Sequence, residues 1–145
     1  MNREIAERWI AALRSGQYRQ AVNYLTHLSG PRDEHGRIIC SHCALGVLVD
    51  LYQQETGELN PWPNIDGDAV SYQDEVTGKY SALCLPSQVM RWAGMQDRRG
   101  KFKDALLVSV DEGSVLCYSV VALNDEARLD FNRISVIIEN HQEEL

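Results

Sequence analysis

The sequence predicts a single α+β domain in which a small antiparallel sheet packs against four to five helices. The chain has 145 residues, a usual size for one domain, and no linker-like stretch divides residues 1–145. Helical periodicity dominates the first part and strand-like alternation comes later, which favours α+β over a parallel βαβ sheet. Residues 43–55 are apolar on nearly every side, which is typical of a central buried helix.

Three helices are predicted in the first 56 residues. Asn2 is a suitable N-cap for a helix that Gly16 ends. Apolar residues in the segment 18–28 recur at helical spacing, which predicts a second helix closed by Ser29-Gly30-Pro31. Ser41 is the candidate N-cap of the central helix over residues 43–55.

The middle of the chain predicts a strand pair followed by a short helix. Residues 80–85 predict a strand that pairs with residues 70–73 across a Thr-Gly turn. Pro86 suits the first position of a helix, and Gly94 follows its expected end.

The last third predicts a hairpin and a final helix. Residues 105–110 alternate in polarity and predict a strand, and residues 115–123 predict its partner across the turn 111–114. Asp130 is the expected cap of the last helix, although β-branched residues 136–138 leave a strand as the alternative. We expect one core, made of Trp9, Leu13, Leu45, Leu48, Leu51, Val108, Cys117, Val121, Phe131, Ile134 and Ile138.

The net charge of −7 is concentrated in one segment. Residues 38–78 contain seven acidic residues and no Lys or Arg, whereas the rest of the chain balances 14 acids against 14 bases. Binding of nucleic acid through a basic patch is therefore not expected. No stretch approaches the roughly 20 apolar residues of a membrane span, and no signal core is present, so we expect a cytoplasmic protein with reduced thiols.

Four segments occur together in a familiar order. They are residues 9–18 (WIAALRSGQY), 43–52 (CALGVLVDLY), 85–94 (LPSQVMRWAG) and 123–125 (LND) followed by Phe131. In this combination the chain resembles a family of small uncharacterised proteins of bacteriophages and prophages. The resemblance implies a phage context, with the host cytoplasm as location, and implies no activity.

Cys43 is the candidate nucleophile if the protein is an enzyme. A thiol at a helix N-terminus gains thiolate character from the helix dipole. A cysteine-dependent hydrolase or transferase also needs a base, and His35 is the candidate, although no histidine follows Cys43 at a position typical of that class. We expect instead that Cys43 is a buried, unbridged thiol and that Cys40 is more exposed.

Two metal-binding patterns are incomplete, so no cofactor is predicted. A zinc-stabilised module is the alternative. Its ligands would be the Cys-x2-Cys pair Cys40 and Cys43, together with His35 and Cys84. A calcium-loop pattern matches at Asn64, Asp66, Asp68, Val70 and Glu75. The calcium pattern lacks its central Gly, because Ala69 occupies that position, and an acidic turn explains it equally well.

The acidic segment carries the leading functional hypothesis, a non-enzymatic phage accessory protein that counters a host defence by binding a protein. Aromatic side chains anchor interfaces, and surrounding carboxylates speed encounter with a basic partner. The alternative is a solvated acidic loop that only keeps the protein soluble. The candidate binding residues are Trp62, Asp66, Asp68, Tyr72, Asp74 and Glu75.

Overall fold

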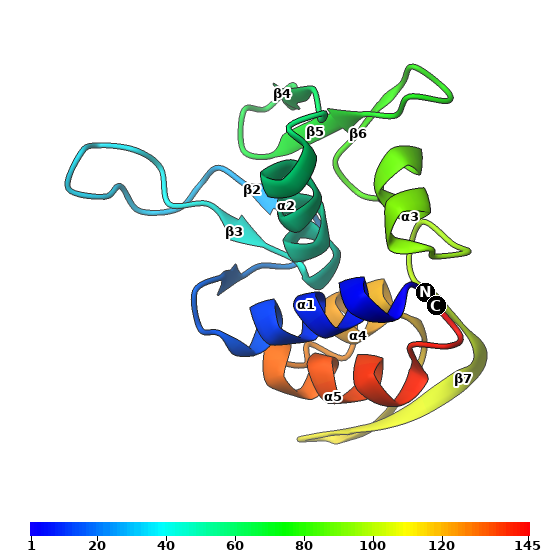
Figure 1. Cartoon of the computed structure of the whole chain (residues 1–145). Coiled ribbons are helices and arrows are strands. Elements are labelled where there is room, and N and C mark those ends of the chain that lie inside the picture. The colour runs from blue at the N-terminus through cyan, green and yellow to red at the C-terminus, as the bar shows by residue number, and fades with distance from the viewer.

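Five helices and three small sheets form the protein, and the computed structural model describes all of residues 1–145 (Figure 1). The helices are α1 (Arg3–Arg14), α2 (Ala44–Thr56), α3 (Ser87–Ala93), α4 (Val120–Asp125) and α5 (Phe131–His141). The strands are β1 (Arg19–Gln20), β2 (Thr26–His27), β3 (Ser41–His42), β4 (Pro61–Pro63), β5 (Val70–Gln73), β6 (Tyr80–Ser81), β7 (Lys101–Val110) and β8 (Gly113–Ser119). The predicted α+β class is confirmed, with three small sheets in place of one.

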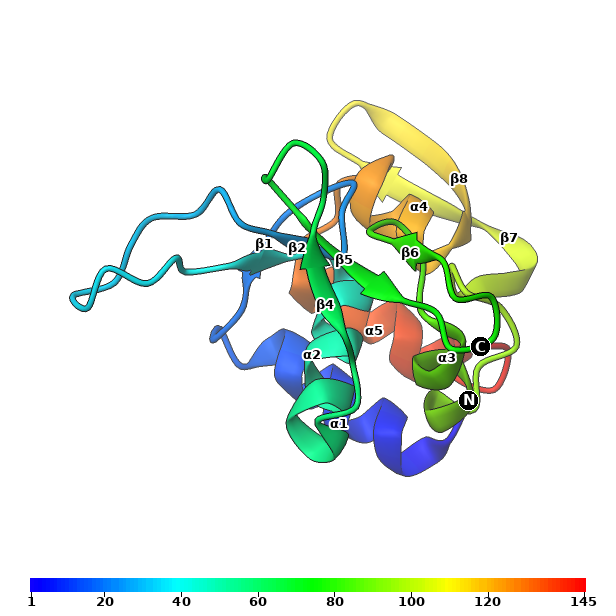
Figure 2. The same ribbon diagram turned by 90° about the horizontal axis from the view of Figure 1, so that it is seen from above.

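The three sheets occupy different parts of the molecule. Their strand orders are β1-β3-β2, β4-β5-β6 and β7-β8, and every pair except β1–β3 is antiparallel. In Figure 1 the β4–β5–β6 sheet lies at one end of α2, whereas α1, α5 and β7 lie at the other. Seen from above in Figure 2, the β7–β8 hairpin lies beside α4, which β8 contacts.

The prediction of a central buried helix is confirmed by α2. Its N-cap is Cys43, not Ser41, which lies in β3, and Gly57 ends it in a left-handed conformation. Gly46 is required in its first turn, since an added Cβ would stand only 1.7 Å from the carbonyl oxygen of Leu25. The buried amide of Asn124 ties the helix start to α4, because its Oδ1 accepts from the Ala44 N–H at 3.2 Å.

The predicted helix over residues 18–28 is wrong. This segment forms β1 and β2, and Asn23 between them has a φ of 72°, which lies outside the helical region. Its backbone bonds to distant residues instead. Ala21 N–H donates to the carbonyl of His42 in β3 at 2.9 Å, and Leu25 N–H donates to the carbonyl of Ala82, just after β6, at 2.7 Å. Long-range pairing has overridden the local periodicity.

The predicted ends of two strands need correction. The strand expected over residues 115–123 ends at Ser119, whose hydroxyl caps α4 by accepting from the Ala122 N–H at 3.2 Å. The strand expected over residues 80–85 is only β6, Tyr80–Ser81. The last segment is the helix α5, capped by Asp130 as predicted, so the alternative of a strand is wrong.

One hydrophobic core joins the helices to the β7–β8 hairpin. The expected core residues all belong to it or pack against it, with Leu51 and Val121 only partly buried. None of the five helices has the length and apolar character needed to cross a bilayer.

Candidate functional site

A pocket opens on the outer face of the β4–β5–β6 sheet and the turn that follows β4. Trp62 is 66 % exposed and Tyr80 is 44 % exposed, and Ile65 is fully exposed. Large apolar side chains that stay in water without a partner are the usual mark of a contact surface when they cluster. The pocket is lined by Trp62, Pro63, Asn64, Ile65, Asp66, Ser71 and Tyr80.

Strand register brings the two aromatic side chains to one face. Trp62 pairs with Ser71, and Tyr80 pairs with Gln73. Because side chains alternate along a strand, Ser71 and Gln73 share one face of β5. Their cross-strand partners, Trp62 and Tyr80, therefore lie on the same face of the sheet. The Asn60 amide fixes the Tyr80 end, since its Nδ2 donates to the tyrosine hydroxyl at 3.2 Å.

An ordered turn presents the apolar and acidic tip of the pocket. The Oδ1 of Asn64 accepts from the backbone N–H groups of Asp68 at 3.1 Å and of Ala69 at 3.2 Å. Its Nδ2 donates to the carboxylate of Asp68 at 2.7 Å. These bonds close the turn and leave Ile65 and Asp66 at its exposed apex.

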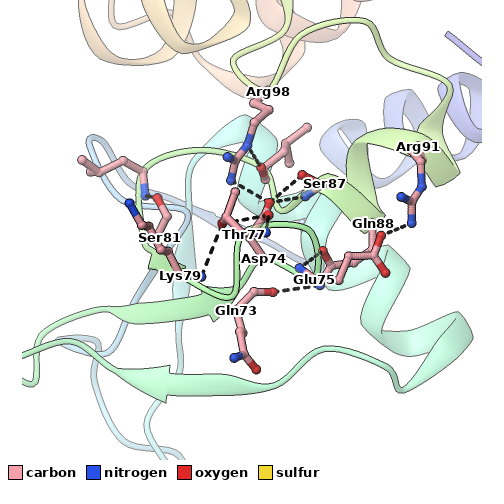
Figure 3. Close-up of polar contacts among 12 residues, drawn as sticks. Gln73, Asp74, Glu75, Thr77, Lys79, Ser81, Ser87, Gln88, Arg91 and Arg98 are labelled. Atoms are coloured by element: carbon pink, nitrogen blue, oxygen red, sulfur yellow. Dashed lines mark hydrogen bonds and ion pairs between the residues drawn. The ribbon is translucent and has the colours of Figure 1, made fainter.

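Asp74 anchors this sheet to the rest of the protein, as Figure 3 shows. The carboxylate is 1 % exposed and accepts from the N–H and hydroxyl of Thr77 and from the N–H and hydroxyl of Ser87, at 2.7–3.0 Å. Arg98 forms an ion pair with it at 3.1 Å. Burial opposes ionisation, but the hydrogen bonds from Ser87 and Thr77 outweigh it and hold the pKa of Asp74 well below its usual range.

The structure separates the six predicted binding residues into three groups. Trp62 and Asp66 line the pocket, and Asp68 lies half-buried in the turn beside it. Tyr72 and Asp74 are buried, so they support the sheet from below and offer no surface to a partner. Glu75 is exposed but forms an ion pair with Arg91 (Figure 3).

Long-range pairing also reduces the acidic excess of residues 38–78. Glu55 pairs with Arg8, and Arg91 and Arg98 neutralise two further acids, as described above. Asp66 makes no hydrogen bond or ion pair in the structure. The negative charge available at the pocket therefore comes chiefly from Asp66 and Asp68.

Five of the seven pocket residues were not predicted as binding residues, and Ile65 and Tyr80 are the exposed large hydrophobic side chains among them. Ile65 follows Asn64, whose side chain closes the turn, and such an Asn is a recognisable turn signal. Tyr80 was assigned to a strand, but only the register with Gln73 places it beside Trp62. That register is set by β5 and cannot be read from Tyr80 itself.

The two residues of the catalytic alternative, Cys43 and His35, lie in different environments. Cys43 is buried, and burial raises the pKa of its thiol to about 12, although the Gly46 N–H that it caps favours the thiolate. His35 is exposed in the loop between β2 and β3, and its ring contacts Glu34. Cys43 and Cys40 are both unbridged, and Cys40 is the more exposed, as predicted.

The structure does not assemble the candidate ligands for zinc or for calcium into a metal site. No group of three or more His, Cys, Asp or Glu side chains is arranged to hold a metal ion. The zinc candidates His35, Cys40, Cys43 and Cys84 are therefore not brought together. Among the calcium candidates, Asn64 and Asp68 bond to each other, and Glu75 forms an ion pair with Arg91.

A second polar cluster lies between α2 and β3 and was not predicted. Thr26 Oγ1 lies 3.1 Å from His42 Nδ1 and 2.9 Å from the Tyr72 hydroxyl. The Tyr18 hydroxyl donates to Asp50 at 2.7 Å, and burial together with this bond raises the pKa of Tyr18 to about 12. Burial lowers the pKa of His42. The contacts of Thr26 link β2 to β3 through His42 and to β5 through Tyr72.

Fold and site together define a single α+β domain with an exposed aromatic pocket on its β4–β5–β6 sheet. Comparison with known families assigns it further. The chain belongs to the family described as Domain of unknown function (DUF8296), whose model matches residues 1–142. No curated protein and no solved structure shows significant similarity to the chain.

Proposed function

We propose that the protein is a non-enzymatic binding module that captures another protein on the β4–β5–β6 face. The observation that carries the proposal is the pair of exposed aromatic side chains, Trp62 and Tyr80, held on one face by register. Rigid aromatic anchors in a pocket are the usual centres of binding energy at protein interfaces. The buried Asp74 network fixes the sheet before a partner arrives, which reduces the ordering cost of association.

The partner has a basic surface beside an apolar side chain. Asp66 at the apex of the turn has no cation of its own, and Asp68 lies next to it. Such carboxylates attract a basic partner and speed its encounter, and salt weakens the effect. The sequence resemblance to phage and prophage proteins supports the narrower proposal of an accessory protein that counters a host defence.

The test begins with capture from host lysate on the immobilised protein and on two variants. Trp62→Ala removes the central anchor of the pocket. Leu107→Ala is the matched control, because Leu107 is an equally exposed apolar side chain on the remote β7–β8 hairpin. Relevant partners are those that the wild-type protein and Leu107→Ala retain and that Trp62→Ala loses.

Binding of the purified partner then decides the proposal. We expect Trp62→Ala to raise Kd about tenfold or more. Asp66→Asn should slow association, and raising the salt concentration should slow it in the wild type. The proposal fails if no retained protein depends on Trp62, or if the partner binds Trp62→Ala as tightly as the wild type.

A further inference from the structure

The β7–β8 hairpin exposes one long strand edge that nothing protects. Natural proteins guard sheet edges with proline, with charged side chains, with bulges or with very short strands. In this protein β4 carries Pro61 and Pro63, and β1, β2 and β6 have only two residues each. The edge formed by β8, Gly113–Ser119, has seven residues without a proline or a charge.

The other edge of the same hairpin is guarded. The Arg133 side chain donates to the backbone carbonyl of Ser109 in β7, and the Glu144 carboxylate accepts from the backbone N–H of Lys103. An irregularity in the pairing also interrupts β7 between Lys101 and Leu106. Another strand could not pair along β7 without displacing these contacts.

The Arg133 contact also shows which backbone groups of β8 face outward. Since Arg133 reaches Ser109 from outside the hairpin, the backbone of Ser109 points away from β8. Residues directly opposite in an antiparallel pair share this orientation, and it repeats at every second residue. Ser114 lies opposite Ser109, so the backbone groups of Ser114, Leu116 and Tyr118 point into open space.

No backbone or side-chain group elsewhere in the chain bonds to these three outward positions. Their side chains are exposed as well, with Leu116 at 51 % and Tyr118 at 56 %. Leu107, which lies opposite Leu116, is 71 % exposed on the same outer face. An unpaired edge next to an apolar face is the surface that strand addition satisfies.

We infer that β8 pairs with β8 of a second copy, antiparallel and about a twofold axis at Leu116, so that two hairpins form one four-stranded sheet. In this register Ser114 of each copy lies opposite Tyr118 of the other, and the Leu116 residues face each other. The contact uses the same patch on both chains, as a closed twofold interface requires.

Charge favours a second copy in this orientation. The paired strand is uncharged, so two copies meet without desolvating an ion. The acidic turn that precedes it, Asp111 and Glu112, lies beyond one end of β8, and antiparallel pairing places the two turns at opposite ends of the interface. Parallel pairing would bring these four carboxylates together. The β4–β5–β6 sheet, which carries the pocket residues, lies at the other end of the molecule from β7 (Figure 1).

Sedimentation equilibrium of the purified protein over a range of concentrations tests the inference, with two leucine variants. Leu116→Lys places two cations at the twofold axis and should raise the dimer dissociation constant about tenfold or more. Leu107→Lys is the matched control, because it removes a leucine that is also exposed on the same face and leaves the β8 edge free to pair. We expect a dimer for the wild type and for Leu107→Lys, and a monomer for Leu116→Lys.

Amide hydrogen exchange provides a second readout that needs no variant. The outward amides of Ser114, Leu116 and Tyr118 should exchange more slowly at high than at low protein concentration, because pairing protects them. A monomeric wild type, or a Leu116→Lys protein that stays dimeric, overturns the inference. Equal loss of the dimer in Leu107→Lys also overturns it, because that result indicates packing through the face of the hairpin instead of its edge.

Discussion

The carboxylate of Asp74 accepts two hydrogen bonds from Ser87, 13 residues further along the chain, and both are 2.7 Å long. One donor is the backbone N–H at the start of α3 and the other is the Ser87 hydroxyl. This contact joins the turn after β5 to α3, and Arg98 joins the same carboxylate from a third segment. Asp74 thus connects the pocket-bearing sheet to the helical part of the protein.

Replacing Asp74 by Asn should destabilise the protein by about 3 kcal/mol at neutral pH, because Arg98 loses its buried partner. The pKa of Asp74 is lower in the folded than in the unfolded chain, so its stabilisation is complete above about pH 4 and is lost as pH falls toward the folded value. Urea unfolding of both proteins at a series of acidic pH values measures this. The difference in unfolding free energy between the wild type and Asp74→Asn should shrink as the pH falls. Asp66→Asn is the control, because this carboxylate is unpaired, and it should be as stable as the wild type.

Gly46→Ala should destabilise the protein by about 3 kcal/mol, because the new Cβ would collide with the carbonyl oxygen of Leu25 at 1.7 Å. Gly57→Ala is the control at the other end of α2. Its φ of 68° disfavours alanine by roughly 1–2 kcal/mol, but no atom lies within 4 Å of the added Cβ. In thermal unfolding, the Tm of Gly46→Ala should lie well below the Tm of Gly57→Ala. The reverse order would contradict the close approach of α2 to Leu25.

Leu48→Ala should cost roughly 2–5 kcal/mol of unfolding free energy, since Leu48 is fully buried in the central helix. Val136→Ala provides the contrast, because Val136 is exposed on α5 and its truncation leaves no cavity. Denaturant unfolding measures both. A loss below about 1 kcal/mol in Leu48→Ala would place α2 at the periphery of the core.

Thiol labelling of the native protein should modify Cys40 and Cys84 first, because both are partly exposed. Cys43 should stay unmodified at neutral pH, since it is buried and its pKa is raised to about 12. Mass spectrometry of the labelled peptides identifies the order. Early modification of Cys43 would support the alternative of a reactive thiolate.

Capping residues and glycines in the sequence correctly predicted helix ends that are set by the residues of the helix itself. The caps Asn2 and Asp130 and the terminal Gly94 each mark a helix end at the place predicted. The segment 18–28 failed because its conformation depends on hydrogen bonds to His42 and Ala82, which lie far along the chain. Of the apolar residues there, Leu25 belongs to the core and Tyr18 packs against it, and their spacing along the chain matches a helix although the segment is not helical.

The sequence indicated which segment holds the candidate site, but it did not indicate which side chains of that segment face the pocket. Trp62 and Asp66 were found because an exposed aromatic and an acid stand out in a proline-bounded, base-free segment. Tyr72 was misplaced because β5 alternates, and the face that each residue takes depends on the register with β4. The neutralisation of Glu75 by Arg91 depends on α3 folding beside the sheet, which no local pattern indicates.

The side-by-side packing of α1 and α5 sets the order in which the chain can mature on the ribosome (Figure 1). Arg14 in α1 bonds to Ser135 in α5, a separation of 121 residues. α1 also contacts α2, but part of its apolar face stays uncovered until α5, the last helix, has been synthesised. Contacts of such long range slow folding and leave apolar surface open to chaperones in the interval. Nascent chains stalled before α5 should consequently remain bound by chaperones, and release should follow once residues 131–141 have emerged.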